Sequence, residues 1–184
     1  MPSHVALLRA VNVGGTGMVA MAALRDLFAD LGFGAAKTLL QSGNVVFDGG
    51  RTAPAKLEAT LEAEALSRLG LRTDFIIRTA AEWSGVVAAN PFPDFARDNP
   101  KFLHVGFAKS APDKAAIAAV EEAIAGLPEQ VKMNGRESYI VYPGGAGTSK
   151  LGPALVKVER KHPSIRATAR NWNTVMKIAA LLDG

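Results

Sequence analysis

The sequence contains no cysteine among its 184 residues, so it has no disulfide framework, no thiolate chemistry and no zinc site built from thiolates. It also lacks any segment near the roughly 20 consecutive apolar residues that a membrane span needs. The first residues, MPSHVALLRAVNV, carry no basic leader, and Arg9 interrupts their apolar run. We therefore expect a cytoplasmic protein with no signal peptide and no membrane partner.

Complete catalytic and ligand-binding motifs are missing as well. The three histidines, His4, His104 and His162, lie in different segments, and none stands at metal-ligand spacing from a second histidine or a carboxylate. Neither of the two common glycine-rich phosphate motifs can be written through residues 12–20 or 143–150. Ser42-Gly43 does not form a nucleophile elbow. The sequence thus predicts no metal and no cofactor, and it leaves open whether the protein is an enzyme.

What is present is typical of a globular chain, with 48% hydrophobic and 21% charged residues. The formal net charge of +4 is unevenly distributed. Residues 150–184 hold seven Lys or Arg against two acidic residues, whereas residues 1–149 are close to neutral. An anionic partner would be sought first in this basic tail, although a solvated helix face would explain the same pattern.

Apolar spacing predicts the order β-α-β-β-α-β over the first 79 residues. The strands are expected at 4–12, 36–41, 44–48 and 72–79, with Ser42-Gly43 as a two-residue hairpin loop. One helix is expected at 21–31 and a second from the Thr52 cap to Leu69. This order is that of a ferredoxin-like split βαβ unit. Both faces of the first strand are apolar, which indicates that the second half or a partner chain covers the open face of the sheet.

The pattern then repeats after a helix at 80–89 and a proline-rich linker, NPFPDFARDNP, at 90–100. A strand at 101–108, a helix at 113–125 and a hairpin turn at Asn134-Gly135 follow, and residues 168–182 are expected to form a last helix. The segment 138–151 can be laid beside 44–57, which indicates a degenerate internal duplication. The predicted fold is α/β (α+β), with ferredoxin-like βαββα(β) subdomains at 1–79 and 101–184 packed together, a connection at 80–100 and a C-terminal helix.

Several stretches in this order resemble a known bacterial family. They are LLRAVNVGG (7–15), LRDLFADLGF (24–33), LLQSGNVVF (39–47), SKL (149–151) and RNWNTVMKI (170–178). The sequence is similar in these stretches to the family catalogued as "domain of unknown function 1697". The resemblance implies ferredoxin-like halves and supplies no activity. Many members have Lys or another polar residue within 16–18, where this chain has Thr-Gly-Met, and Gly in place of Ala10, and the missing lysine counts against a phosphate-binding loop.

The ferredoxin-like topology brings one group of polar residues together, because the first and third strands are antiparallel neighbours. The end of strand one meets the start of strand three, which places near one another Arg9, Asn12, Gly14, Gly15, Gln41, Ser42 and Asn44. Buried polar groups need partners. Either these side chains tie the loop to the hairpin, or together they bind a ligand.

A second group of candidates lies in the basic tail, in the stretch Arg170-Asn171-Trp172-Asn173 at the expected start of the last helix. An arginine beside a helix amino terminus can hold a phosphate or carboxylate, and a tryptophan can stack on a base. The alternative is that Trp172 is core and Asn171 caps the helix. Ser149 and Lys150, before the preceding helix, would either supplement an anion site or cap and solvate that helix.

These observations give a leading hypothesis, in which the protein binds an anionic ligand, either a phosphorylated small molecule or a nucleic acid. Nucleic acid is not favoured, since the sequence shows no aromatic RNA-binding pair and no established reading helix. The alternatives are an enzyme of unrecognised type acting on such a ligand, and a protein-interaction module that forms a homodimer.

Overall fold

The computed structural model describes residues 3–12 and 17–184. The chain divides into two compact units. Unit 1 comprises residues 1–85 together with 177–184, and unit 2 comprises residues 86–176. Within the part of the chain that is described, no helix combines the length and the apolar character needed to cross a membrane.

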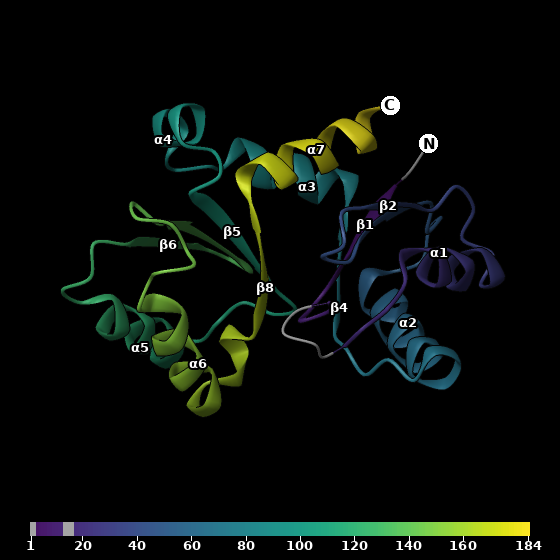
Figure 1. Cartoon of the computed structure of the whole chain (residues 1–184), viewed down its shortest axis with the longest axis horizontal. Coiled ribbons are helices and arrows are strands. Elements are labelled where there is room, and N and C mark those ends of the chain that lie inside the picture. The colour runs from purple at the N-terminus through teal and green to yellow at the C-terminus, as the bar shows by residue number, and fades with distance from the viewer. Residues whose placement is uncertain (1–2, 13–16) are drawn as a thin grey trace. The chain divides into compact units, whose positions relative to one another are not determined.

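Unit 1 contains one antiparallel sheet with the order β2-β3-β1-β4. Its elements follow the chain as β1 (His4–Leu8), α1 (Met21–Asp30), β2 (Lys37–Leu39), β3 (Asn44–Phe47), α2 (Pro54–Leu69) and β4 (Phe75–Thr79). Helices α1 and α2 lie on the same side of this sheet (Figure 1). This is the predicted ferredoxin-like topology.

The core of unit 1 lies between the sheet and its two helices. Alternate strand residues such as Ala6, Phe47 and Ile77 pack there against apolar residues of α1 and α2. The intervening residues point to the opposite face, yet Val5 and Arg78 are fully buried too. The expectation that both faces of the first strand are covered is therefore confirmed.

Unit 2 repeats this arrangement with the sheet order β6-β7-β5-β8, again antiparallel. Helix α3 (Ala80–Ala88) leads from unit 1 into it. Then follow α4 (Pro93–Asp98), β5 (Leu103–Ala108), α5 (Lys114–Ile124), β6 (Gln130–Asn134), β7 (Glu137–Val141), α6 (Leu151–Lys161), a 3-10 turn (Pro163–Ile165), β8 (Ala167–Asn171) and α7 (Trp172–Asp183). Helices α5 and α6 cover one side of the sheet (Figure 1).

Strand register shows how closely the two units correspond. His4 stands opposite Thr79 in unit 1, and His104 stands opposite Asn171 in unit 2. Asn44 pairs with Leu7, three residues after His4, and Glu137 pairs with Phe107, three residues after His104. Asn44 therefore corresponds to Glu137. The duplication is therefore evident in three dimensions, but the sequence comparison of 138–151 with 44–57 was displaced by one residue, which in a strand exchanges the two faces.

The last strand of each unit runs directly into a helix. In unit 1 the Thr79 hydroxyl accepts a hydrogen bond from the Glu82 backbone N–H at 3.2 Å, while the Glu82 carboxylate accepts one from the Thr79 N–H at 2.8 Å. This is a reciprocal capping box. In unit 2 the Asn171 side-chain oxygen accepts from the Thr174 N–H at 3.0 Å. The prediction of one helix over 168–182 was thus wrong for residues 168–171, which form β8.

Two further expectations differ from the structure. The loop between β2 and β3 has four residues, 40–43, because Leu39 already pairs with Asn44. Leu40 and Gly43 turn the chain there with φ of 60° and 69°. The proline-rich stretch 90–100 is not an extended linker, since Pro93 begins the short helix α4, where its missing N–H costs nothing.

Candidate functional site

The first predicted cluster depends on the Asn12 side chain. Its amide nitrogen donates to the Gln41 carbonyl at 2.9 Å and to the Val19 carbonyl at 3.0 Å, and its oxygen accepts from the Val19 N–H at 2.9 Å. The carboxamide thus joins the segment after β1 to the β2–β3 loop. The proximity predicted from topology is confirmed.

Asn44 plays the same part inside the hairpin. Its amide donates to the Leu39 carbonyl at 2.7 Å and to the Ser42 hydroxyl at 3.1 Å. Asn44 is fully buried, so these bonds offset the desolvation of its amide. Arg9 is held through its backbone, which donates to Asp74 and accepts from the Thr73 hydroxyl. Gly14 and Gly15 lie outside the described residues. The Asn12 and Asn44 side chains of this cluster thus bond to backbone groups and to the Ser42 hydroxyl.

The second predicted cluster is divided between two elements. Arg170 does not stand at a helix start; it lies within β8 and is buried, 7% exposed. Its guanidinium donates to the Thr168 hydroxyl at 2.7 Å and to the Ala169 carbonyl at 2.8 Å, and burial lowers the pKa of Arg170 to about 10. Arg78 is its counterpart in unit 1, donating to the Ile77 carbonyl at 2.9 Å.

The neighbours of Arg170 have separate environments. Asn171 caps the following helix, Trp172 is 9% exposed, and Asn173 is exposed. Arg170 and Trp172 are both buried, so neither side chain lies open on the surface, where a phosphate or a base would arrive. The alternative interpretation, a capped helix with a core tryptophan, describes the observed contacts of Asn171 and Trp172.

Ser149 and Lys150 stand before α6, as expected, and they have different surroundings. The Ser149 hydroxyl donates to the Glu129 carboxylate and accepts from the Leu151 N–H at 3.0 Å, so it caps the first turn of the helix. Lys150 is exposed and lies at one end of a groove between α5 and α6.

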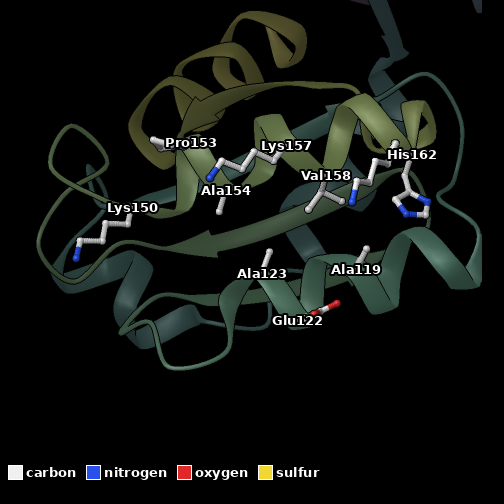
Figure 2. Close-up of a pocket in the computed structure, with 10 residues that line it drawn as sticks. Ala119, Glu122, Ala123, Lys150, Pro153, Ala154, Lys157, Val158 and His162 are labelled. Atoms are coloured by element: carbon white, nitrogen blue, oxygen red, sulfur yellow. The ribbon is translucent and has the colours of Figure 1, made fainter.

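This groove is a hollow of unit 2 with a volume of about 620 Å³. Figure 2 shows α6 along one side and α5 along the other, with Lys150 at one end and His162 near the opposite end. The small side chains of Ala119 and Ala123 on α5 and of Ala154 on α6 leave space between the two helices. We call it the α5–α6 groove.

Three lysines of the α5–α6 groove share one helical stripe. Lys150, Lys157 and Lys161 are seven and eleven residues apart, and at 3.6 residues per turn these offsets return to one face of a helix. All three are exposed, and none forms an ion pair with a carboxylate among residues 3–12 and 17–184. Glu122 on α5 is the acidic residue of the lining. The groove therefore presents a net positive charge.

Of these groove residues, sequence reasoning selected only Lys150 as a candidate. Lys157 and Lys161 were counted in the basic tail, and their spacing from Lys150 was a signal that could have placed the three on one stripe. The α5 side carried no such signal, because alanine at helical spacing indicates only a helix.

Comparisons with known proteins agree with the fold. The profile of a family described as protein of unknown function (DUF1697) matches residues 1–139. A solved structure of a conserved bacterial protein from Streptococcus pneumoniae is similar at a TM-score of 0.73 with 22% sequence identity, over 98% of each chain. No curated protein matches the chain. At this identity the likeness shows the fold alone.

Proposed function

Given that the chain belongs to the family described as protein of unknown function (DUF1697), we propose that the protein binds an anionic ligand in the α5–α6 groove. The observation that supports the proposal is the stripe of Lys150, Lys157 and Lys161 along a hollow of about 620 Å³. Cations gathered along one concave surface raise the local concentration of an anion. The uneven charge of the sequence, with its excess in residues 150–184, leads to the same region.

The dimensions of the groove favour a phosphorylated small molecule. Small-molecule sites typically enclose about 300–1,000 Å³, which includes the volume of this groove. From Lys150 to Lys161 the helix rises by roughly 16 Å at ~1.5 Å per residue. A stripe of this length matches a small phosphorylated molecule better than it matches a nucleic-acid duplex. The ammonium groups would contact phosphate oxygens, and the alanines would allow the remainder of the ligand to approach the helices.

The test compares binding of ATP, pyrophosphate and a short oligothymidylate by isothermal titration calorimetry. The variant Lys157→Gln/Lys161→Gln removes two charges from the groove. The matched control Lys132→Gln/Arg160→Gln removes two charges from exposed positions of unit 2 that do not line it. We expect at least about tenfold weaker ATP binding in the groove variant, since tenfold corresponds to about 1.4 kcal/mol, and wild-type binding in the control.

Each outcome distinguishes one hypothesis from another. Equal loss in both double variants would indicate general charge attraction and would contradict a groove site. Preference for the oligothymidylate, with affinity falling steeply as salt is added, would replace the small molecule by a nucleic acid. The two alternative functions, an enzyme of unrecognised type and a homodimeric interaction module, stay predictions, since no arrangement of the described residues supports either of them.

A further inference from the structure

A second hollow lies on the other side of α6, between this helix and the sheet of unit 2. Its volume is about 160 Å³, and it shares no lining residue with the α5–α6 groove. Val120, Leu155 and Ile140 contribute apolar side chains to it. Val156, 51% exposed, also lines it, which places this hollow at the surface and not in a sealed core. We call it the sheet pocket.

The duplication of the fold explains why the sheet pocket exists. In unit 1, Ala6 pairs with Val45 on one side and Ile77 on the other, and all three are fully buried beneath the helices. The corresponding row in unit 2 is Gly106, paired with Ser138 and Ala169. Each member of the row is smaller in unit 2.

In the adjacent row two of the three positions repeat the reduction, while the third is Gly43 in unit 1 and Arg136 in unit 2. Leu8 pairs with Phe75 in unit 1, whereas Ala108 pairs with Ala167 in unit 2. Both residues of unit 1 are buried in its core, while Ala167 is only half-buried and lines the sheet pocket. Five core positions on three neighbouring strands thus carry smaller residues in unit 2, and four of them, Gly106, Ser138, Ala167 and Ala169, line the hollow.

Three hydroxyl-bearing residues, Ser138, Tyr142 and Thr168, and one carboxylate, that of Glu159, lie among the otherwise apolar residues of the pocket. Ser138 lies over Gly106, so closely that a side chain at position 106 would collide with its oxygen. Tyr142 lies just after the end of β7, two residues beyond Ile140. The Thr168 hydroxyl accepts a hydrogen bond from Arg170, whereas the hydroxyls of Ser138 and Tyr142 have no hydrogen-bond partner within residues 3–12 and 17–184. An apolar concavity with a few polar groups that are available for hydrogen bonds is the usual composition of a small-molecule site.

We propose that the sheet pocket binds a small, uncharged and mainly apolar molecule, about the size of one aromatic ring, that carries a hydrogen-bonding group for Ser138. The size follows from the volume, since an engineered apolar cavity of about 150 Å³ holds benzene. A peptide segment or a helix would require a much larger surface. This site is separate from the anion groove, because α6 presents different faces to the two.

The experiment uses phenol as the probe and follows the amide signals of the ¹⁵N-labelled protein by NMR. The variant Ala169→Ile installs the residue that unit 1 has at the same position. The matched control Ala118→Ile makes the same change at an exposed position of α5 that lines neither hollow. We expect saturable shifts in β7, β8 and α6 of the wild type and of the control, and at least tenfold weaker binding in Ala169→Ile.

A second variant guards against misfolding of the first. Ser138→Val also installs the unit 1 residue, and it replaces the hydroxyl and one Cβ hydrogen by two methyl groups. It should weaken phenol binding more than benzene binding, because only phenol uses the hydrogen bond. The proposal is overturned if the wild type shows no saturable shift, or if Ala169→Ile and Ser138→Val, both folded, bind phenol as the wild type does.

Discussion

Replacement of Asn12 by alanine should destabilise unit 1 through the loss of three hydrogen bonds. The Asn12 carboxamide bonds to both backbone groups of Val19 and to the carbonyl of Gln41, at 2.9–3.0 Å. The two bonds to Val19 are partly buried and the bond to Gln41 is exposed, so each contributes about 0.5–1 kcal/mol and the set about 2 kcal/mol.

The backbone at Asn12 adds a second contribution. Its φ is +53°, in the left-handed region that asparagine tolerates better than alanine does. Asn12→Ala should therefore cost about 3 kcal/mol, and Asn12→Gly, which loses the same bonds without the left-handed strain, about 2 kcal/mol. Their difference isolates the backbone contribution from the hydrogen bonds.

The assay is urea unfolding followed by tryptophan fluorescence. The chain has two tryptophans, Trp83 in unit 1 and Trp172 in unit 2, so a Trp172→Phe background leaves Trp83 as the reporter of unit 1. With an m value of about 2 kcal/mol/M, Asn12→Ala should lower the midpoint by roughly 1.5 M. Gln41→Ala is the control: its carbonyl remains in place and its side chain is exposed, so the midpoint should stay unchanged.

Two results would refute the reasoning. A midpoint for Asn12→Ala within about 0.2 M of the wild type would mean that the carboxamide does not hold the loop to the hairpin. Equal destabilisation by Asn12→Ala and Asn12→Gly would mean that the left-handed backbone carries no strain for alanine, and the estimate of about 1 kcal/mol for it would be wrong.

Three other predictions concern unit 2. Burial raises the pKa of Tyr139 to about 12 and also raises the pKa of Tyr142, and these are the two tyrosines of the chain. At pH 10 the absorbance at 295 nm should therefore show little phenolate until guanidinium unfolds the protein. Burial lowers the pKa of His104 below 6.5, so the unfolded state takes up the proton first as the pH falls. The free energy of unfolding, measured by urea titration, should decline below pH ~6.5, and it should decline less in the His104→Gln variant than in the wild type. Asn171→Ala removes the side-chain cap that accepts from the Thr174 N–H, and it should lower the stability measured by thermal unfolding by about 1 kcal/mol. Asn171→Asp keeps an oxygen at this position and should retain most of that stability.

These three predictions can each fail independently. Ionisation of a tyrosine near pH 10 in the folded protein would contradict the burial of both phenols. A pH dependence that is identical in His104→Gln and the wild type would show that other groups control it. A thermal midpoint unaffected by Asn171→Ala would mean that the end of β8 needs no side-chain cap.

The sequence predicted the topology well because period and order are local properties. Apolar spacing in 4–12 and 44–48 was enough to locate β1 and β3, and their antiparallel pairing then placed Asn12 beside Gln41. The same reasoning missed β8, since no glycine or proline separates Asn171 from Trp172. The only mark of the boundary was Asn171 itself, which favours the cap position.

The two hollows could not be predicted in the same way. The α5–α6 groove depends on which faces of two helices meet, and neither the alanines of α5 nor the lysines of α6 specify a partner. The sheet pocket depends on the difference between residues such as Ile77 and Ala169, which becomes visible only when strand register identifies them as equivalent. A displacement of one residue, as in the comparison of 44–57 with 138–151, compares opposite faces and conceals the difference.

Helix α7 has a consequence for the order in which the protein matures on the ribosome. It begins in unit 2, and its residues 177–184 belong to unit 1, whose other residues end at 85. A nascent chain that has just exposed residue 85 must wait while the whole of unit 2 is translated, on the order of 5–20 s at about 5–20 residues per second. Unit 1 therefore emerges first and is completed last, and a chaperone that shields it would need to remain bound for that interval.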